Sequence, residues 1–195
     1  FDVEVLYAKA SPDEIHIRII ASNRGPDTAE LHLLPTLWFR NTWAWGDGSP
    51  RPSIRAIEQV DDAAWAVRAA HPESPTYWLY GRQSGQRLFT ENETNAQRLW
   101  GVSNDAPYVK DAFHEAVVRG NSAAVNPDRM GTKAAAHYEM KLAAGETQRI
   151  RVRLRKLVAA RTESFTDFDP TFNQRRAEAD EFYHALAPSC LSEEH

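Results

Sequence analysis

The segment Glu91-Asn92-Glu93-Thr94-Asn95 places two carboxylates and two amides within five residues. Such side chains can act as general acid and base, bind sugar hydroxyls, or hold a hard cation. In an extended segment, Glu91 and Glu93 would lie on the same face of the chain. A polar turn whose Asn and Thr side chains cap the backbone has the same composition. This structural role is the interpretation we favour.

Three tryptophans, Trp38, Trp43 and Trp45, fall within a span of eight residues. On an extended segment Trp43 and Trp45 would share one face, where exposed rings could form a platform for sugars. Arg40 and Asn41 would then supply hydrogen-bond donors to the sugar hydroxyls. Buried tryptophans would instead belong to a core or to a contact with another domain, because large aromatic side chains contribute most to both. We favour the buried or domain-contact role.

A third candidate segment runs from Asn126 to His137. Gly131 and the alanines that follow it leave room for a ligand or a neighbouring backbone to approach closely. Asn126, Lys133 and His137 are the polar candidates in this segment. A loop packed against a β domain explains the segment as well, and we favour that explanation. The three segments together form our candidate set for sugar binding or for a domain interface.

Other catalytic patterns are missing from the sequence. The seven histidines form neither H-E-x-x-H nor His-x-His. No G-x-S-x-G elbow and no glycine-rich phosphate loop occurs. Cys190 is nearest in sequence to His184, but the spacing fits no nucleophile motif. We therefore assign no catalytic residue, no metal ligand and no cofactor.

Charge and composition argue against two classes of partner. The net charge is -4 and the pI is about 6.0, which disfavours nucleic-acid binding. No apolar run approaches the roughly 18–20 residues that a membrane-spanning helix needs, so we expect no membrane partner. A single cysteine and the lack of a visible secretory signal favour a cytoplasmic location.

Alternating apolar residues predict the elements that position these segments. Strands are predicted around residues 1–7, 15–19 and 31–39, the third with an edge or bulge at Pro35. Short turns between them predict an antiparallel meander. Further strands are predicted within 54–67, 77–89, 134–142 and 148–154, and a short helix or an irregular segment within 109–120. Four arginines alternate with the apolar residues of the last strand and are interpreted as its solvated face: Arg149, Arg151, Arg153 and Arg155.

The pattern changes after residue 160. Phe165, Phe168 and Phe172 lead into good helix formers, with Pro170 near the expected helix start and Pro188 beyond its end. We therefore predict a mainly β protein, an antiparallel β-sandwich over residues 1–160, followed by a helical linker over 161–195. The sequence starts without Met inside a strand pattern and ends in a helix-start pattern. We expect a piece excised from a longer protein.

Several segments form a recognisable set: FDV (1–3) with YAKA (7–10), LLPTLWFRNTW (33–43), TENETN (90–95), PYVKD (107–111), VNP (125–127), GTKAAAHY (131–138) and EADEFY (178–183). Together they resemble bacterial members of glycoside hydrolase family 63. The similarity runs across nearly the whole chain and weakens over residues 50–75.

The resemblance implies a fold and a parent activity. Members of the family hydrolyse α-glucosidic bonds with inversion and pair an N-terminal β-sandwich, of the super-sandwich type, with a catalytic (α/α) barrel. This chain would be the sandwich, and its last helix would lead toward the barrel. Inversion needs two carboxylates about 6.5–9.5 Å apart. In the family both lie in the barrel, so the resemblance gives no residue of this chain a catalytic role.

Three functions follow as hypotheses. In the first, the chain is a non-catalytic accessory domain that packs on the barrel of the same parent chain and shapes the active-site rim. Such a domain should expose a large apolar patch when isolated. In the second, it is a carbohydrate-binding module that holds an oligosaccharide on exposed tryptophans. In the third, Glu91 and Glu93 make it a free-standing hydrolase. If preceding residues supply strands, one sheet will also have an unpaired edge.

Overall fold

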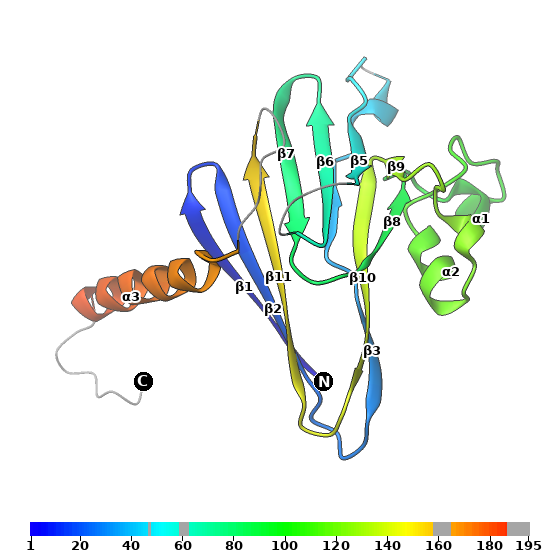
Figure 1. The fold of residues 1–195 in the computed structure, drawn as a ribbon. Coiled ribbons are helices and arrows are strands. Elements are labelled where there is room, and N and C mark those ends of the chain that lie inside the picture. Colours follow the sequence, from blue (N-terminus) through cyan, green and yellow to red (C-terminus); the bar gives the residue numbers. More distant parts are fainter. Residues whose placement is uncertain (47, 59–62, 158–164, 187–195) are drawn as a thin grey trace.

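The computed structural model describes residues 1–46, 48–58, 63–157 and 165–186 of the chain. Its main feature is a pair of packed antiparallel sheets (Figure 1). The larger sheet contains, in spatial order, β1 (Asp2–Ser11), β2 (Glu14–Ser22), β11 (Thr147–Lys156), β7 (Ser74–Gly81), β6 (Trp65–His71), β5 (Ser53–Ile57) and β9 (Met130–Gly131). The smaller sheet contains β3 (Ala29–Leu33), β4 (Thr36–Trp38), β10 (Lys133–Leu142) and β8 (Gln86–Thr90). The predicted mainly β, antiparallel sandwich is confirmed.

The main core lies between the two sheets. Ile19, Trp65 and Val152 of the larger sheet pack in one cluster with Phe89 and Leu142 of the smaller sheet. Each of these side chains is less than 7% exposed. Leu142 and Val152 lie where apolar residues alternate with charged ones, as expected of strands that bury one face.

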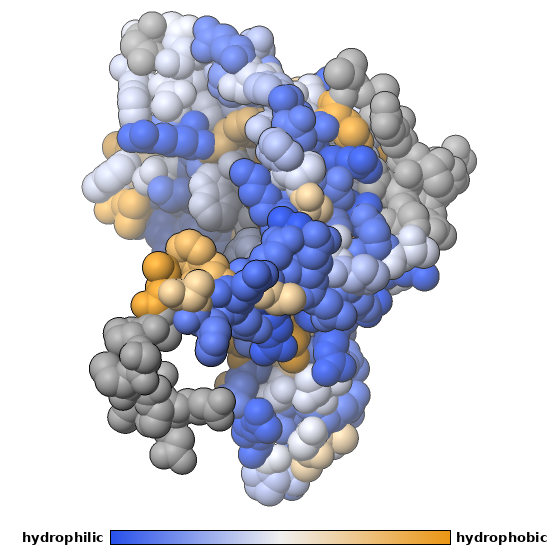
Figure 2. All heavy atoms as spheres, turned by 90° about the vertical axis from the view of Figure 1, so that its left-hand side faces the viewer, coloured by the Kyte–Doolittle hydropathy of each residue, from blue (hydrophilic) through white to orange (hydrophobic). Residues whose placement is uncertain are grey.

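Three α-helices and two short 3₁₀ helices complete the fold: α1 (Ala96–Trp100), α2 (Ala112–Val118), α3 (Phe168–Leu186), η1 (Trp43–Trp45) and η2 (Ser122–Ala124). The long helix α3 projects from the larger sheet, and hydrophobic residues gather at its outer end (Figures 1 and 2). Phe182 and Tyr183 there are 60% and 69% exposed. No helix of the described residues has the length and apolar character needed to cross a membrane. The predicted domain boundary at residues 160–161, Pro188 and Cys190 all lie outside the described residues.

The predicted meander of the first three strands is wrong. Strands β1 and β2 form an antiparallel hairpin, but β3 crosses to the other sheet and pairs with β10. Asn23 fixes this crossing, because its buried amide donates to the carbonyl oxygens of Leu142 and Ala143, at 3.0 and 3.1 Å. The third strand itself keeps one register along β10 on both sides of Pro35, since Leu33 lies opposite Tyr138 and Thr36 opposite Ala135.

The arginine face of β11 is also different from its prediction. Arg149 is exposed, but Arg153 is only 3% exposed. The chain around the start of α3 covers this outer face, where Phe165, Phe168 and Phe172 form a second apolar cluster with side chains of the larger sheet. The solvated-face interpretation is therefore wrong at Arg153, because aromatic residues distant in sequence exclude water from it.

Candidate functional site

The fold brings the three candidate segments to one end of the sandwich. Lys133 at the start of β10 lies opposite Trp38 of β4 on one side and Thr90 of β8 on the other. The backbone N–H of Phe39 donates to Thr132 O at 3.1 Å, and that of Thr132 donates to Thr90 O at 3.1 Å. We call the region formed by residues 39–51, 91–95 and 126–132 the loop cluster, and restrict it to its described residues.

Arg51 holds the two candidate carboxylates of the loop cluster. Its Nη2 lies 3.0 Å from Glu91 Oε2 and 3.2 Å from Glu93 Oε1. The Thr132 hydroxyl also donates to Glu91 Oε2 at 2.8 Å, and the Trp43 indole N–H donates to Glu93 Oε1 at 3.1 Å. Each carboxylate thus has a cation and a second donor. This arrangement is that of a structural clamp, and it disfavours the free-standing hydrolase that would use both carboxylates in catalysis.

The amides of the loop cluster bind backbone groups. Asn92 Nδ2 donates to Phe39 O at 2.8 Å, and Asn41 Nδ2 donates to Asn92 O at 3.1 Å, so the two amides join the first two segments. Asn95 Oδ1 accepts from the N–H of Arg98 at the start of α1. Asn126 Nδ2 closes its own loop by donating to Met130 O at 2.8 Å. The contacts of Asn95 and Asn126 are the local caps expected of polar turns, whereas those of Asn41 and Asn92 join two distant loops.

Two tryptophans of the first segment face solvent. Trp38 is 57% exposed and Trp45 is 61% exposed, so neither belongs to the core, and of the favoured roles the contact with another domain stays a prediction for both. Residues 43–45 form the 3₁₀ helix η1, so the extended geometry that would put Trp43 and Trp45 on one face does not occur. Trp43 is half-buried beside Arg51, whereas the Arg40 guanidinium lies 5.0 Å from the centre of the Trp45 ring. One face of Trp45 is therefore covered by a cation.

Lys133 lies at the border of the loop cluster and turns toward α2. Its Nζ donates to Lys110 O at 2.7 Å and lies 4.6 Å from the centre of the Phe113 ring. Burial, and then the charge of Lys110, lower the pKa of Lys133 below its usual value. It lines a cavity of about 530 Å³ with residues of α2. Lys133 is thus a packing residue between β10 and α2.

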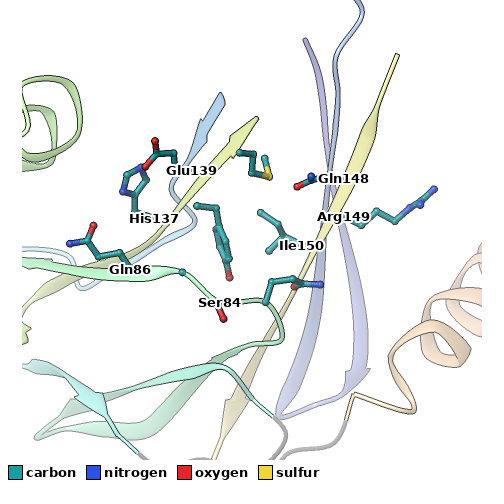
Figure 3. Close-up of a pocket in the computed structure, with 11 residues that line it drawn as sticks. Ser84, Gln86, His137, Glu139, Gln148, Arg149 and Ile150 are labelled. Carbon is teal, nitrogen blue, oxygen red and sulfur yellow. The ribbon is translucent and has the colours of Figure 1, made fainter. Parts of the chain in front are cut away.

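His137 lies apart from the loop cluster. It lines a different hollow of about 490 Å³, together with Gln86 on β8 and Gln148 and Ile150 on β11 (Figure 3). One of its ring nitrogens, Nε2, is 2.8 Å from His32 Nδ1. Burial, followed by the neighbouring His32, lowers the pKa of His137. His137 therefore does not belong to a single site with Glu91 and Trp43.

One group among the described residues has the spacing of metal ligands. Glu14, His16 and Asp167 offer ligand atoms that all lie within 4.8 Å of one another. The guanidinium of Arg153 already pairs with both Glu14 and Asp167. Because this fixed cation compensates both carboxylates, the group is explained as an ion-pair cluster.

Sequence reasoning missed Arg51, the residue that organises the loop cluster. It lies in the stretch 50–75, where the family resemblance weakens, and nothing in one sequence pairs it with Glu91. A sign of its role was the excess of carboxylate in residues 91–95, which needs a cation from elsewhere if the segment is partly buried.

Replacing Arg51 with Met should loosen the loop cluster. The variant keeps an apolar stem but leaves Glu91 and Glu93 without their shared cation. We expect the free energy of unfolding at pH 7 to fall by about 1 kcal/mol, a modest loss because the Arg51 side chain is 50% exposed. Urea unfolding would measure it, and 1 M NaCl should shrink the difference.

Arg98→Met is the matched control for that measurement. Arg98 makes one exposed ion pair, with Asp111 at 3.1 Å, so its removal should change stability by less than about 0.5 kcal/mol. Equal losses in the two variants would contradict the special role of Arg51.

Comparison with known proteins adds one relative. No family model matches the sequence. The chain is similar over its whole length to the uncharacterized protein YMR196W of Saccharomyces cerevisiae, with 32% identity over 228 residues. The chain spans 21% of the length of that yeast protein.

Proposed function

We propose that this chain is a non-catalytic β-sandwich domain of a longer, α-glucosidase-like inverting glycoside hydrolase. The loop cluster, with Trp38 beside it, packs on the catalytic (α/α) barrel of the same polypeptide and shapes the rim of its active site. The proposed enzyme acts in the cytoplasm on an oligosaccharide. Its acid and base lie in the barrel, in keeping with the resemblance to glycoside hydrolase family 63.

One observation carries this proposal. At one end of the sandwich, Glu91 and Glu93 form ion pairs with Arg51. Trp38 and Trp45 are exposed at the same end. Exposed tryptophans beside a rigid polar cluster are typical of an interaction surface, because aromatic residues are enriched where surfaces become buried. The yeast relative, about five times as long as the matched region, supports a domain within a larger protein.

Glucose release tests the proposal directly. Near pH 6, the 195-residue chain should release no glucose from a panel of α-glucosides and glucosyl disaccharides. The Glu91→Gln and Glu93→Gln variants of this chain should likewise release no glucose. The longer polypeptide should release glucose whose anomeric configuration is inverted, as proton NMR would detect. Turnover by the short chain that both substitutions abolish would overturn the proposal and place the acid and base in the loop cluster.

A carbohydrate-binding module is the second candidate, and the exposure of Trp45 favours it. Titration with malto-oligosaccharides, followed by heat and by tryptophan fluorescence, separates the two functions. A binding module would give a signal that Trp45→Ala removes. Trp100→Ala is the matched control, because Trp100 is 67% exposed on α1. No signal at millimolar sugar would exclude the module.

A further inference from the structure

The sandwich is open along one side. The outer strand of the larger sheet is β1, and the outer strand of the smaller sheet on that side is β3 with β4. Between them lies a groove of about 440 Å³, with Val5 and Ile17 of the larger sheet on one wall and Leu37 of the smaller sheet on the other. None of the described residues that line it is charged. The groove therefore suits an apolar occupant.

Strand β1 has an uncovered apolar face toward this groove. Val3, Val5 and Tyr7 alternate along the strand and are 47%, 44% and 70% exposed. On the opposite face, Leu6 and Ala8 pack in the cluster of α3. Within the described part of the chain, β1 pairs with β2 alone, so its second edge also lacks a partner. The apolar face of β1 toward the groove therefore has no described strand of the smaller sheet over it, and exposed apolar surface of this kind is a site for a partner.

We propose that the groove holds a β-strand supplied by the same longer polypeptide from outside these 195 residues. This inference rests on the proposed function, because it requires that longer polypeptide. The added strand has apolar residues at alternate positions. It pairs with the unpaired edge of β3 and β4 and so extends the smaller sheet over β1, whose face toward the groove is exposed at Val3, Val5 and Tyr7.

Two observations favour this occupant over a second copy of the chain. The similarity to the yeast protein covers 21% of that protein, which leaves ample chain to supply a strand. Pairing β1 with β1 of another copy would widen the larger sheet further, and Val3, Val5 and Tyr7 would still face an uncovered groove. A strand added to the smaller sheet covers them.

Hydrogen exchange, read by mass spectrometry on the 195-residue chain and on the longer polypeptide, tests the proposal. In the short chain, the amides of residues 29–38 and 2–9 that point to the unpaired strand edges should exchange fast. In the longer polypeptide, the amides of residues 29–38 that gain partners should exchange at least 100-fold more slowly. Residues 147–156 of the central strand β11 should be protected in both. Equal exchange of residues 29–38 in the two proteins would overturn the proposal.

A substitution in the groove sharpens the test. Val5→Lys should shift the urea midpoint of the short chain little, because Val5 is half exposed there. In the longer polypeptide, Val5→Lys should make the protected amides of residues 29–38 exchange at least 10-fold faster than they do without the substitution, because the lysine would have to be buried. Val102→Lys is the control, since Val102 is 54% exposed after α1 and does not line the groove. It should leave the exchange of residues 29–38 unchanged.

Two further outcomes separate the possible explanations. Protection in the short chain that grows with protein concentration, with a dimer in sedimentation, would identify a second copy as the occupant and refute the proposed strand. A longer polypeptide that protects residues 29–38 but releases no glucose would support the strand and refute the glycosidase function alone.

Discussion

Arg153→Met is expected to lower the free energy of unfolding at pH 7 by about 3–5 kcal/mol, the range for breaking a buried ion pair from one side. Arg153 is 3% exposed, and its Nε lies 3.1 Å from Glu14 Oε1, which is itself almost fully buried. A second pair joins Arg153 to Asp167, just before α3. Methionine fills much of the same volume but leaves the Glu14 carboxylate short of compensating charge. Urea unfolding followed by circular dichroism would measure the loss.

The pH dependence of that loss identifies its cause. Burial raises the pKa of Glu14, but the hydrogen bond from His16 and the charges of Arg153 and Arg155 outweigh it, so the pKa lies below 4.5. A carboxyl with a lowered folded-state pKa contributes stability that is complete above the unfolded-state value and disappears as pH falls through the folded-state value. The difference between wild type and Arg153→Met should therefore be largest near neutral pH and shrink as the pH falls and Glu14 becomes protonated.

Arg149→Met provides the control on the same strand. Arg149 is exposed, so its substitution should change stability by less than about 0.5 kcal/mol. Similar losses at positions 149 and 153, or a loss at 153 that persists unchanged at pH 3, would contradict the buried ion-pair explanation.

The arginines of β11 show how far the sequence predicts the fold. Strict alternation with Ile150, Val152 and Leu154 correctly predicted a strand with one face in the core. It could not show what lies on the other face, because that depends on a segment that the topology folds back. The sequence did contain a sign of the covering segment, because acidic and aromatic residues alternate after residue 164. Asp169, for example, pairs with both Arg151 and Arg18.

The loop cluster shows a second limit of prediction from the sequence. Local composition singled out residues 38–45 and 91–95, because polar turns and clustered tryptophans are visible in short windows. The pairing of Glu91 with Arg51 and the exposure of Trp45 depend on how distant loops meet, which periodicity does not encode. The crossing of β3 to the second sheet was missed for the same reason, since a short turn is compatible with a hairpin and with a crossing.

The second large effect is expected for Gly131→Ala. A Cβ at this position would lie 2.3 Å from Thr90 O and 2.9 Å from Thr90 C, both backbone atoms of β8. Backbone cannot rotate away as a side chain can, so β8 and β9 must separate. We expect the free energy of unfolding to fall by about 3 kcal/mol, at the upper end of ordinary overpacking costs. Thermal and urea unfolding would both report it.

Gly25→Ala is the matched control, because the nearest atom to its Cβ is a side-chain oxygen, Asn23 Oδ1, at 3.3 Å. Its cost should stay within about 1 kcal/mol. The Gly131 variant should also have a local effect, since Thr132, the next residue, donates from its N–H to Thr90 O and from its hydroxyl to Glu91. Hydrogen exchange of residues 89–93 should therefore rise more than that of β11. A uniform rise across both strands would mean that Gly131 supports the whole sandwich rather than the loop cluster in particular.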